Sequence, residues 1–268
     1  MKLALAQLDV TAGAVETNRA RALDAIESAA DRGADLVALP ELWNVGFFAF
    51  DRYDELAEPL DGPTLSSIES AATEHEIGVL AGSIVEDLSA SDAPGPAETG
   101  LANTTVLFGR DGSRLATYRK RHLFGYESEE SELLVPGETL GVAEFEGFTV
   151  GMTTCYDLRF PELYRELLEV NVTLVLVPSA WPYPRVEHWK SLPKARAIEN
   201  LFYVATINGA ATFEDATLLG RSTVYDPWGT PVASSGDEPT MVVTDVDPAR
   251  VERVREDFPA LEDRRSRP

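Results

Sequence analysis

The chain has 268 residues, of which 44% are hydrophobic and 25% are charged. This is ordinary globular composition, so the chain can bury a sizeable core without disulfides or metals, and disorder of the whole chain is excluded. With 45 acidic against 23 basic residues the formal net charge is −22, which excludes nucleic acid and anionic membrane surfaces as partners.

From the N-terminus onward, short β-branched runs alternate with amphipathic helical stretches, which predicts an α/β or layered α+β architecture. A helix is predicted at 15–32 because Ala22, Ile26 and Ala29 recur on one face. A second helix, at 63–75, begins at a Gly-Pro pair. The other segments in this part of the chain are strands at 3–9, 35–39 and 78–85 and a loop at 89–100.

Hairpins, helices and strands are predicted for the rest of the chain. An Asp-Gly turn predicts a first hairpin and Gly147 a second. Pro178 is expected to end a buried strand, and Asp247 to cap a last helix that begins at Pro248. The elements are hairpin strands at 104–108 with 114–118 and at 142–145 with 149–153, helices at 161–169 and 186–199, and strands at 172–177, 202–207, 222–225, 232–234 and 241–246. No composition break marks a linker, so residues 1–268 are predicted to form one domain.

Lysine is avoided in this chain, since only four of the 23 basic residues are lysines. Many acidic residues with few lysines are typical of a protein that works in high salt, where charge repulsion is screened over short distances. We therefore hypothesise a halophile-type surface. The alternative is an acidic face for a basic partner, which would concentrate the charge, whereas the acids are spread from Asp9 to Asp263.

The single cysteine, Cys155, excludes an intrachain disulfide and a multi-cysteine zinc site. The N-terminus lacks the apolar length of a signal peptide, and the longest apolar runs are strand-sized, far below a membrane span. These features predict a cytoplasmic protein. The sequence has no glycine motif of the nucleotide-binding kind and its three histidines are scattered, so neither a cofactor nor a metal site is predicted.

Cys155 falls where a strand gives way to a helix. Nearby helical N–H groups and Arg159 would favour the thiolate, which is the form that attacks carbonyl carbon. By position alone, however, a lone cysteine is more often a buried small hydrophobe. Glu41 follows the strand at 35–39 and is either a general base or a turn carboxylate. Lys120 ends a strand within a basic run, which either serves catalysis or offsets acidic neighbours.

Three segments occur in order along the chain and read LPE at 39–41, YRKRHL at 118–123 and CYDLRFPEL at 155–163. Further matching segments are PSAW at 178–181, HW at 188–189 before ARAIEN at 195–200, and GRS at 220–222 before DPWG at 226–229. This ordered set resembles the signature segments of the nitrilase superfamily, the carbon–nitrogen hydrolases. The resemblance covers nearly the whole chain.

The resemblance implies a four-layer α-β-β-α sandwich and hydrolysis of a non-peptide C–N bond through a thioester acyl-enzyme. In that scheme Cys155 is the nucleophile and Glu41 is the base that takes its proton and later activates water. Lys120 is the cation that stabilises the oxyanion of the tetrahedral intermediate. The backbone N–H of Tyr156, directly after the nucleophile, is the expected second oxyanion donor.

Many amidases of this family have a second glutamate before a Pro-Gly pair. Glu130 is the predicted match, with Glu129 as the fallback, because the acidic run at 127–132 leaves the register open. Glu41 and Glu130 beside one lysine would titrate as a coupled pair.

The signature strings most resemble the branch that contains ω-amidases and the amidases that act on deaminated glutathione. Those enzymes cleave an amide on a small carboxylated acid. The loop that contains Trp181 and Arg185 lacks the Thr-Gly-Pro of that branch and lies where the family builds its acyl pocket. Arg185, with Arg159 and Arg196 as alternatives, is hypothesised to hold a substrate carboxylate. Phe47 is expected in an aromatic wall of the same pocket.

A small amide and water are therefore the predicted partners, and a nitrilase, an N-carbamoyl amine amidase and a non-catalytic binding module of the same fold are the alternatives. A binding module is expected to have lost part of the triad, which is complete here. A papain-like pair of Cys155 with His188 is open by composition, although the surrounding motifs favour the lysine scheme. A glutaminase-type ammonia donor or an acyltransferase would need a further domain or a membrane segment.

Members of the family usually form homodimers or higher homo-oligomers, and the tail at 258–268 resembles their segment that packs across the dimer.

Overall fold

The computed structural model of the protein describes residues 1–126, 128–214 and 216–265. The helices are α1 (Val15–Asp31), α2 (Tyr53–Leu56), α3 (Pro63–Glu74), α4 (Glu130–Leu133), α5 (Pro161–Glu169), α6 (Val186–Asn200) and α7 (Pro248–Asp257), with 3-10 segments η1 (Phe50–Arg52) and η2 (Cys155–Arg159). The strands are β1 (Lys2–Gln7), β2 (Leu36–Ala38), β3 (Gly78–Leu80), β4 (Ile84–Asp87), β5 (Leu101–Phe108), β6 (Arg114–Arg119), β7 (Gly141–Phe145), β8 (Phe148–Met152), β9 (Leu174–Ser179), β10 (Tyr203–Asn208), β11 (Thr223–Tyr225), β12 (Pro231–Ser234) and β13 (Thr240–Asp245).

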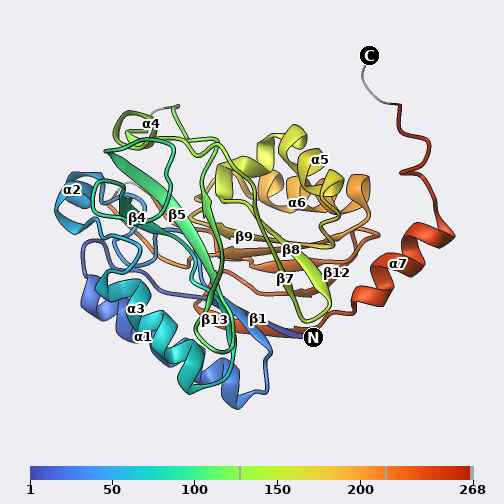
Figure 1. Cartoon of the computed structure of the whole chain (residues 1–268), viewed down its shortest axis with the longest axis horizontal. Helices are drawn as coiled ribbons and strands as arrows, with labels where there is room; N and C mark the ends of the chain where they lie inside the picture. Colours follow the sequence, from blue (N-terminus) through green and yellow to red (C-terminus); the bar gives the residue numbers. More distant parts are fainter. Residues whose placement is uncertain (127, 215, 266–268) are drawn as a thin grey trace.

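Two sheets form the centre of the molecule. The seven-stranded sheet has the order β13-β1-β2-β3-β5-β4, with β6 paired to β5, and the six-stranded sheet has the order β12-β11-β10-β9-β8-β7. Helices α1 and α3 pack on the outer face of the first sheet, and α5 and α6 pack on the outer face of the second (Figure 1). The predicted four-layer α-β-β-α sandwich is confirmed.

The alternating direction of side chains along the central strands produces the four layers. Leu5 of β1 and Leu176 of β9 belong to the core between the two sheets. Their neighbours point the other way, so Ala4 packs in the core under α1 and α3, and Val175 in the core under α5 and α6. Because successive side chains of a strand face opposite sides, a strand buried on both faces is an unbroken apolar run. That is why the short apolar runs of the sequence predicted the central strands.

The single strand predicted at 78–85 is wrong, because this segment forms two strands, β3 and β4, with β5 between them in the sheet. The break lies at Gly82, whose φ is +62° and where a Cβ would lie 2.0 Å from the carbonyl oxygen of Pro40. Ser83 donates from its N–H to the same carbonyl at 3.1 Å and accepts from the N–H of Leu42 at 2.9 Å. The break therefore holds the loop that carries Glu41.

The prediction that Pro178 ends a buried strand is also wrong, since β9 runs through it to Ser179. The carbonyl of Leu176 accepts from the N–H of Thr153 at 3.2 Å on the side where β8 lies. Residue 178 faces the same side, but β8 pairs with β9 only as far as Leu176. The N–H that proline lacks is therefore not needed at this position.

Other predicted features are confirmed, including both hairpins and the cap at Asp247, whose carboxylate accepts from the N–H of Ala249 at 3.0 Å. The short helices α2 and α4 were not predicted, because four residues are too few to show a helical period. In the described part of the chain no helix has the length and apolarity to cross a membrane. Of the tail predicted at 258–268, residues 266–268 lie outside the described residues.

Candidate active site

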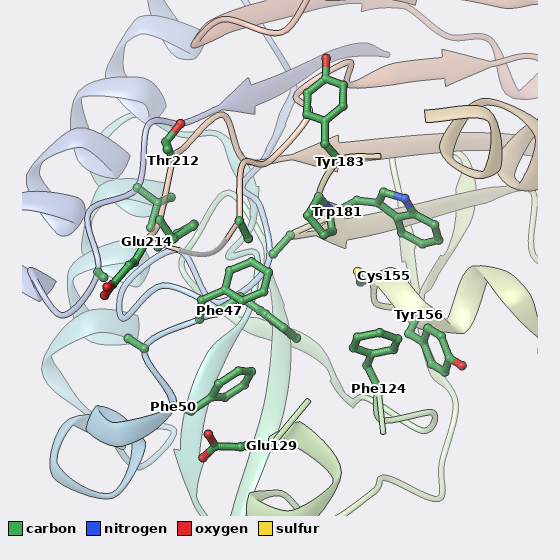
Figure 2. A pocket seen from close by; sticks show the side chains of 18 of the residues that line it. Phe47, Phe50, Phe124, Glu129, Cys155, Tyr156, Trp181, Tyr183, Thr212 and Glu214 are labelled. Atoms are coloured by element: carbon green, nitrogen blue, oxygen red, sulfur yellow. The ribbon is translucent and has the colours of Figure 1, made fainter. Parts of the chain in front are cut away.

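Three strands end beside one cavity, and each is followed by one of the predicted catalytic residues. Glu41 follows β2, Lys120 follows β6, and Cys155 opens η2 after β8. Both sheets therefore contribute to the site. The cavity has a volume of ≈ 1090 Å³ and is lined by Lys120 and Cys155, with Cys155 reaching it from the start of η2 (Figure 2). This is ample space for a small-molecule substrate.

The ammonium group of Lys120 bridges two buried carboxylates. Its Nζ donates to Glu41 Oε1 at 2.8 Å and to the two oxygens of Glu130 at 2.7 and 2.9 Å. Burial lowers the pKa of Lys120, but the charges of Glu130 and Glu41 raise it by more, so the amine stays protonated. Burial raises the pKa of Glu130, and the opposing effect of Lys120 does not cancel this rise. Glu130 and not Glu129 is thus the partner of Lys120, while Glu129 lies at the cavity wall (Figure 2).

The carboxylate of Glu41 is fixed at both oxygens. Oε1 accepts from Lys120 and from Asn103 Nδ2, the latter at 2.9 Å, and Oε2 accepts from the N–H of Ala180 at 2.8 Å. The charge of this carboxylate also acts on the Cys155 thiol, whose pKa it raises. Glu41 therefore stands in the position that a base acting on the thiol must occupy.

Cys155 occupies a strained backbone conformation with φ +46°, which is rare for a residue other than glycine and frequent at functional sites. The turn that follows is fixed by Asp157, whose carboxylate accepts from the N–H of Thr154 at 2.9 Å and from the N–H of His122 at 3.0 Å. His122 lies two residues after Lys120. Asp157 therefore ties the turn of Cys155 to the segment that carries Lys120.

The thiol of Cys155 is protonated at rest. Burial raises its pKa well above the ordinary value, and the charge of Glu41 raises it further. The expectation that helical N–H groups and Arg159 favour the thiolate is wrong, because the thiol's pKa is raised and not lowered. The Arg159 guanidinium lies over aromatic rings, 5.5 Å from the ring centre of Tyr156 and 5.0 Å from that of Trp181. A base must therefore remove the proton when the substrate is attacked.

Aromatic side chains form the cavity wall beside the thiol (Figure 2), and arginine side chains also line the cavity. Of the residues predicted for the pocket, Phe47, Trp181 and Arg185 line the cavity, and so does Tyr156, which was predicted for its backbone N–H. The guanidinium of Arg185 lies 5.4 Å from the ring centre of Phe124, and Arg159 lines the same cavity. Within the described parts of the chain, neither arginine forms an ion pair with a carboxylate, so both are available to an anionic group of a ligand.

Two alternatives raised by the sequence lie away from the reacting groups. Arg196 is buried and donates to the carbonyl of Leu158 at 3.1 and 2.9 Å, so its role is structural. His188 lies 3.3 Å from Arg159 through its Nδ1 and does not line the cavity, so it is not paired with Cys155. Among residues 1–126, 128–214 and 216–265, no group of three or more His, Cys, Asp and Glu side chains is arranged to hold a metal ion.

Two polar residues of the site, Asn103 and Asp157, were missed by the sequence analysis. The spacing from Thr154 to Asp157 is that of a capping box, and this signal could have identified the second of them. Asn103 has no comparable local signal. Its position depends on the register of β5 against β6. The hairpin turn alone does not give this register, because a bulge shifts the pairing between Leu107 and Phe108.

Comparison with known proteins agrees with this geometry. The family model for carbon–nitrogen hydrolases matches residues 2–256. The chain is similar to Omega-amidase NIT2 of Homo sapiens, with 33% identity over 99% of this chain and 95% of that protein. It is 32% identical to 2-oxoglutaramate amidase of Bacillus subtilis over 96% of this chain and 95% of that protein. Among solved structures it resembles a variant amidase from Nesterenkonia sp. AN1, which shows covalent addition of the acetamide moiety of fluoroacetamide at the active-site cysteine. The TM-score is 0.82 and the sequence identity is 27%, with coverage of 98% of this chain and 95% of that one.

Proposed function

Since this chain belongs to the carbon–nitrogen hydrolase family, we propose that it hydrolyses small ω-amides that carry a carboxylate, through a thioester on Cys155. It is an amide hydrolase that acts on C–N bonds other than peptide bonds. One observation carries the proposal: the buried cluster of Glu41, Lys120 and Glu130 lies beside the Cys155 thiol at the edge of a cavity of small-molecule size, which Lys120 and Cys155 both line.

In the first half-reaction Glu41 takes the proton of the Cys155 thiol, and the sulfur forms a bond to the carbonyl carbon of the amide. Negative charge then develops on the carbonyl oxygen, where Lys120 and the backbone N–H of Tyr156 stabilise it. Collapse of this intermediate breaks the C–N bond, and the proton held by Glu41 leaves with the ammonia.

In the second half-reaction water is the nucleophile. Glu41 takes a proton from the water as its oxygen attacks the carbonyl carbon of the thioester, and the same oxyanion donors stabilise the second intermediate. The C–S bond then breaks, the sulfur of Cys155 regains a proton from Glu41, and the carboxylic acid is released. Each proton taken is thus returned, so one residue serves as base and acid in turn.

The cationic wall of the cavity supports a carboxylated substrate. The net charge of −22 means that carboxylates are abundant in this chain. Arg185 and Arg159 nevertheless lie against aromatic rings. A guanidinium can bind a carboxylate through two parallel N–H···O bonds, and an aromatic ring on its other face keeps it in place. The names of the two relatives, an ω-amidase and a 2-oxoglutaramate amidase, support the same class of substrate.

Replacing Arg185 by Ala is expected to weaken the binding of carboxylated amides. A charge-assisted hydrogen bond of about 1.5–3 kcal/mol is removed, so KM for an ω-amide of a dicarboxylic acid should rise by about 10–100-fold with little change in kcat. Neutral aliphatic amides should be hydrolysed as before. Steady-state kinetics on the two classes of amide measures the difference.

The control for this prediction is Arg185→Lys, which keeps the charge but loses the bidentate geometry and should fall between wild type and Arg185→Ala. Equal effects of Arg185→Ala on carboxylated and neutral amides would remove Arg185 from substrate recognition. The same assays should include nitriles and N-carbamoyl amines, because a preference of the wild type for either would replace the ω-amide assignment with one of the alternatives.

We also propose that the acidic surface adapts the protein to high salt, because acids outnumber basic residues 45 to 23 and lysines are few. Screening by concentrated salt shortens the reach of self-repulsion, so the yield of refolding from urea should rise several-fold between low and molar KCl. Circular dichroism of the refolded protein measures the yield, and sucrose in place of KCl controls for a general stabilising effect. A yield that is indifferent to KCl would contradict the proposal.

The predicted homo-oligomer and the cytoplasmic location remain predictions. One feature supports association through the tail: Trp228 is 44% exposed and Phe258 50% exposed, and their ring centres lie 5.8 Å apart. Large aromatic side chains left together on a surface are typical of protein–protein contacts.

A further inference from the structure

A buried amide bridges the two carboxylates of the site. Asn103 Nδ2 donates to Glu41 Oε1 at 2.9 Å and to Glu130 Oε1 at 3.1 Å, and all three side chains are buried. Each of these carboxylate oxygens therefore receives one N–H from a charged group, Lys120, and one from a neutral group, Asn103. The amide makes the same pair of contacts as the lysine without adding charge.

The strand register explains why Asn103 lies there. In the hairpin of β5 and β6 Thr104 pairs with Arg119, and the N–H of Lys120 donates to the carbonyl of Asn103 at 2.9 Å. Asn103 and Lys120 are thus opposite each other across the ladder, and opposite residues of an antiparallel pair project to the same face of the sheet. The ladder therefore directs the amide and the ammonium to one face, where both contact the same carboxylate oxygens.

The orientation of the amide is determined by its surroundings. With two carboxylate oxygens as neighbours, only the NH₂ end of Asn103 can face them, because its carbonyl would be a third acceptor among acceptors. The carbonyl oxygen of Asn103 is buried with no hydrogen-bond partner among the described residues. A buried carbonyl without a hydrogen-bond partner costs free energy. The orientation that lets the NH₂ group contact both carboxylates therefore leaves the carbonyl oxygen unsatisfied.

The cluster has more negative than positive charge when both carboxylates are ionised. Two carboxylates contact a single ammonium, whereas the Cys155 thiol is neutral at rest and so is the Tyr53 hydroxyl, which donates to the carbonyl of Phe47 at 2.6 Å. An added proton on the carboxylates would restore the balance, but Glu41 could then no longer accept the proton of Cys155. Neutral donors oppose that protonation, because they stabilise the anionic form of a carboxylate.

We propose that Asn103 is a positioning residue that keeps Glu41 and Glu130 ionised and in register with Lys120, and thereby sets the pH above which Cys155 becomes reactive. This inference rests on the proposed role of Glu41 as the base. The two carboxylates share one lysine and one amide, so removal of the amide acts on both of them. Loss of the amide donors should therefore move the reactivity of Cys155 to higher pH.

The test uses the reactivity of the thiol and not turnover. Cys155 is the only cysteine, so the rate of alkylation of the intact protein by iodoacetamide reports this thiol alone. In Asn103→Ala the midpoint of the rate against pH should rise by about one pH unit, which is an about tenfold slower alkylation below the midpoint. Asn103→Asp has nearly the same size but places an acceptor beside two carboxylates, and should be slower still at neutral pH.

Thr104→Val is the matched control. Thr104 is the next residue of β5 and donates from Oγ1 at 2.6 Å to Glu86, a buried carboxylate that is paired with Arg119. The control thus removes a neutral donor from a buried ion pair on the other face of the same strand. It should lower the unfolding temperature and leave the pH midpoint of alkylation unchanged.

The inference is overturned if Asn103→Ala, like the control, lowers only the unfolding temperature. Should Asn103→Ala not fold, Asn103→Asp decides, and a wild-type pH profile in that variant overturns the inference. If Glu41→Gln leaves the alkylation rate unchanged, the base is wrong and the inference falls with it. Failure of the enzyme to hydrolyse ω-amides, with a shifted alkylation profile in Asn103→Ala, would refute only the substrate class.

Discussion

Replacing Lys120 by Met is expected to lower the free energy of unfolding by about 3–5 kcal/mol, because it leaves Glu41 and Glu130 buried without their counter-charge. Amide hydrolysis should fall by at least about a hundredfold, since the oxyanion loses its cation. In the variant a buried carboxylate must take up a proton on folding, so the stability deficit should shrink as the pH is lowered. Urea unfolding followed by fluorescence at several pH values measures the stability, and amide kinetics measures the activity.

The double variant Lys120→Met with Glu130→Gln separates the two effects. Removing one carboxylate charge should restore part of the lost stability but none of the activity, so the two substitutions should not be additive in the free energy of unfolding. Additive losses, or a Lys120→Met protein as stable as the wild type, would show that the cluster is not held by this ion pair.

Replacing Cys155 by Ala is expected to reduce amide hydrolysis by about 10⁴-fold or more, because the bond-forming atom is gone. The free energy of unfolding should change little, since the thiol is small and alanine meets the same backbone strain at φ +46°. Steady-state kinetics and urea unfolding on the same preparations measure both quantities.

The control for the cysteine prediction is Cys155→Ser, which keeps a nucleophile of similar shape but with a much weaker attacking atom. It should retain the fold and hydrolyse amides far more slowly than the wild type. Hydrolysis by Cys155→Ala within about tenfold of the wild-type rate would contradict covalent catalysis at this position.

The layers of the fold were predictable from the sequence because a strand that is buried on both faces is an unbroken run of apolar residues. An apolar run such as that of β9 must be covered on both sides, and the neighbouring amphipathic helices supply the cover. The errors at Gly82 and Pro178 have a different origin. Both depend on which neighbouring strand is present at a single position, and this is decided by the sheet and not by the local sequence.

The site was predictable to a similar degree. The residues Glu41, Lys120 and Cys155 each follow a strand within a recognisable segment, and the structure brings them into one cluster. Asn103 was not predictable, since a single asparagine in a buried strand carries no sign of the two carboxylates it contacts. The mistaken expectation for Arg159 arose because closeness in sequence to Cys155 does not determine the direction of a long side chain, which here lies over Trp181.

Hydrolysis through a thioester on Cys155 with Glu41 as the base requires a covalent acyl-enzyme during turnover. Rapid acid quenching during turnover of an ω-amide, followed by mass spectrometry of the intact chain and its peptides, tests this claim most directly. We predict an added mass equal to the acyl group on the peptide that contains Cys155, lost in Cys155→Ala and formed far more slowly in Glu41→Gln. Turnover with no adduct on that peptide, or with an adduct on another one, would contradict the mechanism.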